Sequence, residues 1–353
     1  MKIGSDISQL INTKYAAGVQ RVVVETHKNL IKVGKNRDQE FVGVNLSGQN
    51  ELPSHNYLAS DPLIKNHQSN LDGLDFVCLL DANVGYVFDF VRKNGFNGQI
   101  VTMIHDILPI THPKYFNFAD DGNFVRAFKT YILKILKFSN QIIVTSNYTK
   151  QQILNLNWKI NCPIEVIRLG TFKTNIEIMP KADHDSINLI SVNTVEPRKG
   201  HSDILDAFEI LIESENECNL ILVGKYGWDS VEIKNRILNH HLFGKKLFWY
   251  SGITDEEMAK LYEISDIAIV GALEEGFGLT LEEGLAFKKK VIVRDLPIFH
   301  ERKANNMYFF SGNGVQLANR ILDVKNKEME SFSPIRTMTD FADDLSKLML
   351  KIK

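Results

Sequence analysis

The sequence has few cysteines and no long apolar stretch, and both absences exclude whole classes of protein. Its three cysteines, Cys78, Cys162 and Cys218, lie far apart without a C-x-x-C pair, which argues against a disulfide framework or a structural zinc site. No apolar run approaches the roughly 18 residues of a membrane-spanning helix, and the segment Met1–Asp6 lacks the apolar core of a signal peptide. We therefore expect a cytoplasmic protein.

A large excess of charge of either sign is also missing. The chain has 41 lysines and arginines against 43 aspartates and glutamates, a formal net charge of −2. This balance gives no general attraction to nucleic acid, so we expect no nucleic-acid partner. The G-x-G-x-x-G pattern of dinucleotide-binding enzymes is absent too, which argues against a dehydrogenase.

Short apolar runs alternate with amphipathic stretches, and 353 residues are enough for two domains. Continuous runs of Val, Ile and Leu between helical patterns indicate buried parallel strands and an α/β fold. Residues 169–186 are polar and aperiodic, so they are the best candidate for an interdomain linker. Strands are expected at 40–46, 75–80, 99–105, 141–145, 165–168, 188–192, 219–223, 246–250, 266–270 and 290–293. Helices are expected at 20–33, 124–138, 147–156, 202–213, 230–239, 255–264, 281–287 and 340–350.

A glycine-rich turn with an acid on either side is the most informative motif. The turn Gly276-Phe277-Gly278 leads into a helix that begins near Leu279. Glu275 precedes the turn, and Glu283 lies one helical turn after it. Backbone amides at a helix N-terminus bind phosphate, and glycines let the phosphate approach closely. Carboxylates accept hydrogen bonds from hydroxyls, so the motif predicts a site for a sugar nucleotide.

Two adjacent cations follow the expected strand 188–192. Arg198 and Lys199 occupy the segment Glu196–Gly200, immediately before a helix. Arginine offers a planar fork and lysine a point charge, a combination that suits a diphosphate.

In the first half of the chain, the expected strand 99–105 ends in His105-Asp106. A histidine at the carboxyl end of a parallel strand can hydrogen-bond a sugar hydroxyl or a backbone carbonyl. Asp106 can orient His105 or approach an acceptor hydroxyl, and the sequence leaves both roles open.

In this order, the elements resemble the retaining glycosyltransferases of family 4, in particular members that assemble polysaccharides. The resemblance is carried by Gly18-Val19-Gln20-Arg21, His105-Asp106, Glu196–Gly200, the spacing of Glu275 and Glu283, and Leu296-Pro297 followed by Glu301. It implies a GT-B fold, with two Rossmann-like doubly wound domains facing a central cleft. Residues 1–169 would bind the acceptor and 170–335 the nucleotide sugar, while the C-terminal helix in 336–353 would cross back to the first domain.

The resemblance also implies individual roles. The catalytic candidates are His105, Asp106, Arg198, Lys199 and Glu275. Among them, Glu275 would contact hydroxyls of the donor sugar, and the two cations would neutralise the leaving diphosphate. The donor-binding candidates are Gly18, Gly224, Ile253, Gly276, Phe277, Gly278, Leu279, Thr280 and Glu283, with Glu283 on the ribose and with Gly224 and Ile253 near the nucleobase. Arg21 is equally well read as a catalytic residue or as a surface residue of the first helical turn.

Three places depart from the family pattern. Many relatives have an arginine about five residues before the conserved lysine, where this chain has Asn193. A proline and a Gly-x-Pro-Val element are replaced by Thr280 and by residues 287–290. Because Asn193 carries no charge, Arg198 would have to serve beside Lys199, which affects the geometry of donor binding rather than the fold.

A possible metal motif lies elsewhere. Asp183-His184-Asp185 spells D-x-D, the metal-bridging motif of the other main glycosyltransferase fold. It falls in the expected linker rather than at the end of a strand in a nucleotide site. We therefore expect no metal and no bound cofactor.

The expected helix 124–138 has a cationic side. Arg126, Lys129, Lys134 and Lys137 fall within roughly 140° of one another, opposite an apolar side. We favour a core helix with a solvated cationic face. The alternative is a helix that lies on anionic lipid, which would place the protein peripherally on the inner face of the cell membrane.

The expected function is a retaining, metal-independent hexosyltransferase. It would move a mannose-type sugar from GDP, or a hexose from UDP, to a bacterial cell-surface glycan or a lipid-linked precursor. One alternative is a catalytically silent GT-B protein that serves as partner or chaperone of another glycosyltransferase. The other is a different nucleotide-using enzyme of this fold, such as an epimerase. The sequence leaves the oligomeric state open.

Overall fold

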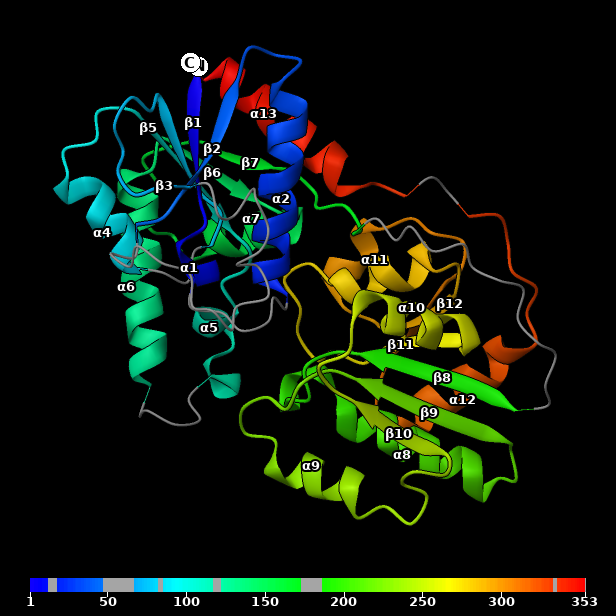
Figure 1. The fold of residues 1–353 in the computed structure, drawn as a ribbon. Helices are drawn as coiled ribbons and strands as arrows, with labels where there is room; N and C mark the ends of the chain where they lie inside the picture. The colour runs from blue at the N-terminus through cyan, green and yellow to red at the C-terminus, as the bar shows by residue number, and fades with distance from the viewer. Residues whose placement is uncertain are drawn as a thin grey trace. The chain divides into compact units, whose positions relative to one another are not determined.

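The computed structural model describes residues 1–11, 18–46, 67–81, 85–116, 122–172, 186–332 and 335–352. The chain divides into two compact units (Figure 1). Unit 1 consists of Met1–Phe172 together with Arg336–Lys353, and unit 2 consists of Lys173–Ile335. The boundaries thus lie at 172/173 and 335/336, beside the expected 169/170 and 335/336.

Unit 1 contains a parallel sheet with the strand order β3-β2-β1-β4-β5-β6-β7 among its described residues. The order runs outward from β1 in both directions, as in a doubly wound Rossmann-like sheet. The strands are β1 (Lys2–Asp6), β2 (Glu40–Val44), β3 (His67–Gln68), β4 (Phe76–Leu79), β5 (Gln99–Ile104), β6 (Gln141–Val144) and β7 (Ile164–Val166).

Helices cover both faces of this sheet, with α2 and α13 on one face and α4 and α6 on the other (Figure 1). In α6 the buried residues recur at spacings of three and four, so one stripe of the helix faces the core. That stripe joins the apolar core formed by the strands. The helices are α1 (Ser8–Ile11), α2 (Val19–Gly34), α4 (Gly85–Lys93), α5 (Leu108–Thr111), α6 (Asn123–Phe138), α7 (Asn147–Asn155) and α13 (Met338–Lys351).

The C-terminal helix α13 packs along α2 and so completes unit 1. Its apolar side chains Phe341 and Leu345 are fully buried. The chain returns to unit 1 beside the point where it left. The amide of Thr171 donates to the carbonyl of Arg336 at 2.8 Å, and the amide of Met338 donates to the carbonyl of Thr171 at 3.2 Å.

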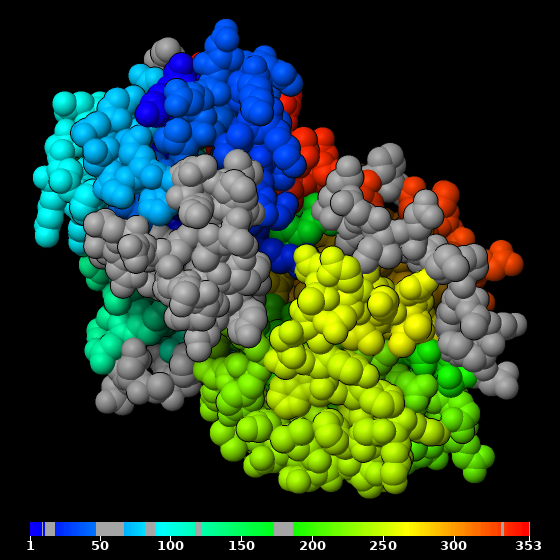
Figure 2. Space-filling model, viewed as in Figure 1, coloured from blue at the N-terminus to red at the C-terminus, as the bar shows by residue number. Residues whose placement is uncertain are grey.

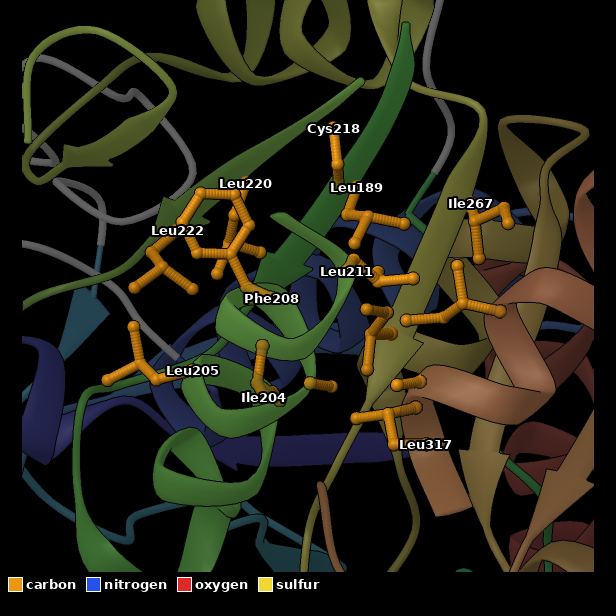
Figure 3. Packing of buried hydrophobic residues seen from close by; sticks show 14 of the residues in the cluster. Leu189, Ile204, Leu205, Phe208, Leu211, Cys218, Leu220, Leu222, Ile267 and Leu317 are labelled. Atoms are coloured by element: carbon orange, nitrogen blue, oxygen red, sulfur yellow. The ribbon is translucent and has the colours of Figure 1, made fainter. Parts of the chain in front are cut away.

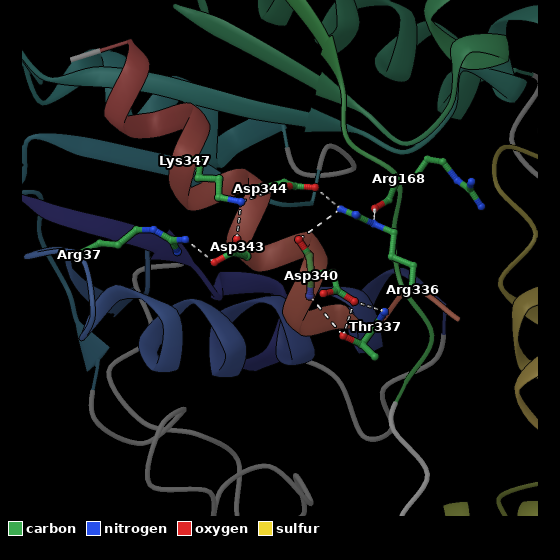
Figure 4. A network of polar contacts seen from close by, with 8 residues as sticks. All are labelled: Arg37, Arg168, Arg336, Thr337, Asp340, Asp343, Asp344 and Lys347. Atoms are coloured by element: carbon green, nitrogen blue, oxygen red, sulfur yellow. Dashed lines mark hydrogen bonds and ion pairs between the residues drawn. The ribbon is translucent and has the colours of Figure 1, made fainter. Parts of the chain in front are cut away.

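Polar contacts fix the outer side of α13 (Figure 4). Asp343 pairs with Arg37, which follows α2, at 2.5 Å. Arg336 donates to the carbonyl of Arg168 at 2.8 Å and pairs with Asp344 at 2.6 Å. These contacts join segments that are far apart in the sequence.

Unit 2 contains a second parallel sheet, with the order β10-β9-β8-β11-β12-β13 among the residues described there. Its strands are β8 (Ile187–Val192), β9 (Cys218–Val223), β10 (Leu247–Tyr250), β11 (Ile267–Val270), β12 (Lys290–Arg294) and β13 (Met307–Phe310). Its helices are α8 (His201–Glu213), α9 (Val231–Leu238), α10 (Asp255–Ile264), α11 (Leu279–Ala286) and α12 (Gly314–Lys325).

The core of unit 2 lies between the sheet and the pair α8 and α12, which contact one another (Figure 3). Phe208 and Leu211 of α8 meet Leu189 and Leu220 of the central strands, and Leu317 comes from α12. All five side chains are at most 1% exposed. This rigid layer holds the loops at the carboxyl edge of the sheet.

The expected α/β fold with two Rossmann-like parallel sheets is confirmed. Each of the ten expected strands is present within a residue or two of its expected bounds. The sequence did not predict β1, β3, β13, α4 or α12, nor the short helices α1 and α5. β1 reads Lys-Ile-Gly-Ser-Asp and is buried because it lies between β2 and β4, a position that its small residues do not reveal. Among the described residues, no helix combines the length and apolar character needed to span a bilayer.

Candidate active site

The predicted donor-binding motifs meet at the carboxyl edge of the unit 2 sheet. The segment Glu196–Gly200 follows β8, and Glu274–Gly278 follows β11, which pairs directly with β8. Because the carboxyl ends of adjacent parallel strands share one edge, the two loops are neighbours. The amide of Leu273 donates to the carbonyl of Arg198 at 2.7 Å, which fixes one loop to the other.

Four charged side chains form a compact cluster between these loops. The Nζ atom of Lys199 lies 2.6 Å from a carboxylate oxygen of Glu275. The guanidinium of Arg198 lies 3.4 Å from the same oxygen and 2.8 Å from the carboxylate of Glu196. Arg198 also donates to the carbonyl of Glu274 at 2.8 Å. Arg198 is therefore held by both loops, whereas Lys199 pairs with Glu275 and has two further N–H donors for a ligand.

The charges of the cluster shift the ionisation of its acids. Burial by itself would raise the pKa of Glu275, but Lys199, then Arg198 and the amide of Gly276 more than offset it and hold that pKa below its usual range. Burial raises the pKa of Glu196 despite the nearby Arg198 and Lys199. Glu275 is thus an ionised carboxylate at neutral pH, as a hydrogen-bond acceptor for sugar hydroxyls should be.

Close packing around the two loops leaves room only for glycine at two positions. At Gly200 the backbone φ is +70°, and an added Cβ would lie 2.1 Å from the carbonyl oxygen of Gly271. At Gly278 φ is +89°, and a Cβ would lie 2.5 Å from the ring of Phe299. Gly278 is the N-cap residue of α11, so its left-handed conformation sets the direction in which the helix begins.

The first turn of α11 offers backbone amides at this edge. The carbonyl of the N-cap residue Gly278 accepts hydrogen bonds from the amides of Leu281 at 3.1 Å and Glu282 at 3.4 Å. The amides of Gly278, Leu279 and Thr280 come before these in the chain. They lie at the helix N-terminus, which favours an anion. Glu283, the second acid of the motif, is 7% exposed within the same helix.

Arg302 contacts the turn Gly276–Gly278 from the core side, and its role was not predicted from the sequence. Its side chain is 3% exposed and pairs with Glu282 at 3.0 Å. It also donates to the carbonyls of Ile298 at 3.0 Å and Phe277 at 2.6 Å, and its guanidinium lies 4.2 Å from the Phe277 ring. In a trans peptide the carbonyl and the following N–H point in opposite directions. By holding the Phe277 carbonyl in the core, Arg302 turns the Gly278 amide away from the core.

A family comparison agrees with this geometry. Residues 173–332 match the family model described as glycosyl transferases group 1. Unit 2 is a group 1 glycosyltransferase domain. The match covers nearly all of the unit that holds the charged cluster.

Relatives extend the likeness beyond the group 1 domain. The serotype-specific mannosyltransferase WbdA of Escherichia coli is 28% identical over 338 residues, with 88% of this chain and 41% of WbdA covered. The O-antigen chain mannosyltransferase B of Escherichia coli is 24% identical over 218 residues, with 56% of this chain and 54% of that protein covered. The chain thus spans about two fifths of the length of WbdA.

Solved structures place both units in one known fold. A sucrose-phosphate synthase from Thermosynechococcus elongatus matches with a TM-score of 0.65 at 16% identity, over 98% of this chain and 94% of that one. Anabaena HepE in complex with UDP and glucose matches with a TM-score of 0.63 at 14% identity, over 99% and 96%. At these identities the likeness concerns the fold alone, and it confirms the predicted GT-B architecture.

The group 1 domain also contains the residues expected near a nucleobase. Gly224 follows β9, and Ile253 lies in the loop after the adjacent strand β10. The amide of Gly224 donates to the carbonyl of Tyr250 at 2.9 Å, and Trp249 donates from its ring nitrogen to the carbonyl of Gly224 at 2.8 Å. Trp249 therefore holds this turn, a role that the sequence did not suggest. Asn193 is buried, and its Nδ2 atom has no hydrogen-bond partner among the described residues.

The predicted acceptor residues lie in unit 1. The Nε2 atom of His105 is 2.8 Å from the carbonyl oxygen of Leu80, which places the proton on Nε2. Asp106 accepts a hydrogen bond from the amide of Leu108 at 2.9 Å and so caps α5. Of the contacts foreseen for His105, the structure displays the one to a backbone carbonyl.

Two buried acids accompany His105 at this edge of the unit 1 sheet. Asp6 ends β1, and Asp81 follows the neighbouring strand β4; both are 2% exposed. Burial raises the pKa of Asp6 to about 6, with a contribution from Asp81 and against the lowering effect of its hydrogen bonds to Ser8. Asp6 accepts both the amide and the hydroxyl of Ser8, which ties β1 to α1.

The remaining predicted residues are also placed. Gly18 is the N-cap residue of α2, with φ at +54° and an exposed position. The guanidinium of Arg21 lies 4.1 Å from the ring of Phe172, and the residue is half-buried. Its role, catalytic or structural, stays a prediction. Asp183 and Asp185 fall outside the described residues. Within the described ranges, no group of three or more His, Cys, Asp or Glu side chains has the arrangement of a metal site.

Proposed function

We propose that the protein is a retaining glycosyltransferase that transfers a hexose from a nucleotide sugar to a bacterial cell-surface glycan or its lipid-linked precursor. The observation that carries the proposal is the Lys199–Glu275 pair at 2.6 Å beside the N-terminus of α11, inside a group 1 glycosyltransferase domain. This places a cation, an ionised carboxylate and helix amides within one small region. A nucleotide sugar has a diphosphate that can bind the cation and the helix amides, and hydroxyls that can donate to the carboxylate.

In this proposal the residues divide the work by charge. Lys199 and the amides of Gly278, Leu279 and Thr280 stabilise the leaving diphosphate, on which negative charge accumulates during transfer. Glu275 accepts hydrogen bonds from the donor sugar, and Glu283 binds the ribose. Arg198 keeps Glu275 and the two loops in place through its contacts to Glu196 and Glu274. His105 and Asp106 serve the acceptor.

Mannose is the favoured sugar and GDP the favoured nucleotide, with UDP-hexoses as the alternative. The support is the likeness to WbdA and to mannosyltransferase B, both named as mannosyltransferases. Thermal unfolding with GDP, UDP, dTDP or ADP tests the proposal. A nucleotide at 100 times its Kd adds about 2.7 kcal/mol of stability, so GDP should raise the melting temperature by several degrees. If none of the four stabilises the protein, the nucleotide-sugar function is wrong.

We further expect that transfer needs no divalent metal. Lys199 and the helix amides already supply positive charge at the diphosphate, so a cation has no necessary place there. With the donor that passes the stability test, turnover should persist in excess EDTA. The double variant Asp183→Ala/Asp185→Ala should remain within about twofold of wild type. This expectation would be contradicted if EDTA abolished turnover, if Mg²⁺ or Mn²⁺ restored it, and if the double variant lost turnover as well.

The stereochemistry and the place of action complete the proposal. Retention means that the anomeric configuration of the donor sugar is kept, which NMR of the product reports directly. An acceptor built on a lipid carrier would be met at the inner face of the cell membrane, where this protein would act as a peripheral enzyme.

A further inference from the structure

Glu196 is the acid of the charged cluster that has no part in donor binding so far. Its side chain is 1% exposed and pairs with Arg198 at 2.8 Å. Arg198, Lys199 and Glu275 are 12%, 13% and 15% exposed. Burial removes the water that stabilises a carboxylate, so the interior disfavours its charged form. Holding Arg198 does not require an acid, because the carbonyl of Glu274 also accepts from it. An acid at this position therefore points to a role for its charge.

The cluster is electrically neutral before a ligand binds. The charged groups that act on Glu196 are the cations Arg198 and Lys199 and the second acid, Glu275. The guanidinium of Arg198 contacts both acids, and Lys199 pairs with Glu275 at 2.6 Å. A diphosphate that binds the remaining N–H groups of Lys199 adds negative charge to this balanced set. The two acids then share the charge of Arg198, and the cluster as a whole becomes negative.

The described neighbours of Glu196 outside the cluster bring no further cation. His201 is 1% exposed, and burial lowers its pKa to about 4 against the raising effect of the Glu196 backbone, so its ring is neutral at neutral pH. In the loop after β9, Glu196 meets Gly227, where an added Cβ would lie 3.2 Å from its own Cβ. Glycine has no side chain to offer a charge. A proton from solvent is the compensating charge that remains.

The environments of the two acids decide which of them takes the proton. Burial raises the pKa of Glu196 despite Arg198 and Lys199. Burial acts on Glu275 as well, but Lys199 and Arg198 outweigh it and hold the pKa of Glu275 below its usual range. When two neighbouring acids are driven apart in this way, the one with the higher pKa is protonated first. Glu275 thereby keeps the charge with which it accepts sugar hydroxyls.

We propose that Glu196 takes up a proton from solvent when the diphosphate of a nucleotide sugar binds at Lys199, and returns it when the diphosphate leaves. This inference rests on the proposed function. Glu196 does not touch the donor and is a positioning residue, because it acts through Arg198 and Lys199. A protonated carboxyl still has an oxygen that accepts from Arg198, so both loops stay in place while the added charge of the donor is partly compensated.

Proton uptake gives donor affinity a defined dependence on pH. Glu196 binds a proton more readily in the complex than in the free protein, so affinity rises as the pH falls from the pKa of the complex to that of the free protein. This range begins above 4.5, the ordinary pKa of the group, because burial raises the pKa of Glu196 already in the free protein. Within the range, one proton changes affinity by at most about tenfold per pH unit.

Isothermal titration of the full chain with GDP-mannose tests the proposal. The diphosphate of this donor does not titrate between pH 5.5 and 8, so its own charge stays constant. At pH 6.5, the binding enthalpies in MES, PIPES and imidazole, which differ in ionisation enthalpy, give the number of protons taken up. Wild type should take up about half a proton or more, and its affinity should fall as the pH rises to 8. If thermal unfolding selects UDP, UDP-glucose takes the place of GDP-mannose.

Glu196→Gln separates proton uptake from a purely structural role. Glutamine keeps an oxygen that accepts from Arg198 but has no charge and binds no proton. Uptake should fall close to zero, and affinity should become nearly independent of pH. At pH 8 wild type binds the donor against the charge of Glu196, so the variant should bind about tenfold more tightly there. If Glu196 served merely to hold Arg198, the variant would bind more weakly at every pH.

The matched control is Glu209→Gln. Glu209 also pairs with an arginine, Arg236 at 2.8 Å, but it is 35% exposed and meets α9, a helix at the surface of unit 2 (yellow-green in Figure 2). It should take up as many protons as wild type. Protons taken up elsewhere, for example by Asp6 in unit 1, are common to all three proteins and cancel in the comparison. Binding by wild type without proton uptake, or full uptake in Glu196→Gln, would overturn this inference alone. Binding of neither nucleotide sugar would overturn the proposed function together with it.

Discussion

Glu275→Gln is expected to lower the rate of sugar transfer by about 10–150-fold while nucleoside diphosphate binding stays intact. Glutamine keeps the size of the side chain but removes the charge, and a hydrogen bond to a charged group is worth about 1.5–3 kcal/mol. The carboxylate of Glu275 now pairs with Lys199 at 2.6 Å. Without that charge, Lys199 is more available to a diphosphate, so GDP should bind as tightly as before or more tightly. Turnover should therefore fall, whereas nucleotide affinity should stay the same or rise.

The neighbouring acid supplies the control for this measurement. Glu274→Gln makes the same chemical change one residue earlier in the same loop and leaves the backbone carbonyl that accepts from Arg198 in place. We expect it to stay within about twofold of wild type. Wild-type turnover in Glu275→Gln would remove the sugar-binding role. It would then favour a protein that supports another glycosyltransferase without transferring sugar itself.

Arg302→Lys is expected to weaken nucleoside diphosphate binding by about tenfold and to destabilise the group 1 domain. Lysine keeps the positive charge but cannot reach Glu282 and the carbonyls of Phe277 and Ile298 together. Removing one partner of a buried ion pair costs about 3–5 kcal/mol of stability. Because lysine retains the positive charge, the loss of stability in Arg302→Lys should be smaller than that. Without the contact to Phe277, the Gly278 amide loses its fixed direction, and one hydrogen bond to the diphosphate is lost. Isothermal titration with GDP and urea unfolding measure the two effects.

A second buried cation separates loss of stability from loss of orientation. Lys289 is 7% exposed and donates to the carbonyls of Glu263 and Ser265 at the opposite edge of the same sheet. Lys289→Met should therefore destabilise unit 2 without changing GDP affinity in the folded protein. Wild-type GDP affinity in folded Arg302→Lys would show that Arg302 does not orient the turn.

Most of the strands and the donor motif could be predicted because the signals are local. Runs such as β9 and β12 carry enough Val, Ile and Leu to indicate buried parallel strands. The glycine turn at Gly276–Gly278 lies next to the helix it starts, so spacing alone predicts an N-terminal anion site. β1 lacked such a signal, since its burial comes from the strands on either side.

The contacts of the site could not be predicted in the same way, because they join residues that are far apart in the chain. Arg302 meets Phe277 across 25 positions, and Arg198 meets Glu275 across 77. The assignment of Arg198 to the diphosphate came from its neighbour Lys199 and stays a prediction. Its contacts to Glu196 and to the carbonyl of Glu274 could not be predicted in that way. A charged residue's type can be read from the sequence, but its partner depends on how the loops pack.

The passage of the chain from unit 1 to unit 2 and back has a consequence for synthesis. All of unit 2 is made between Phe172 and Arg336, so unit 2 can fold as a continuous stretch. Unit 1 cannot, because α13 covers α2 only after residues 338–351 have left the ribosome. About 300 residues separate the end of α2 from the start of α13. At about 5–20 residues per second, the nascent chain exposes the apolar side of α2 for roughly 15–60 s. Unit 1 is thus the first unit to be synthesised and the last to complete its fold. Chaperones that bind exposed apolar helices would bind α2 during this interval.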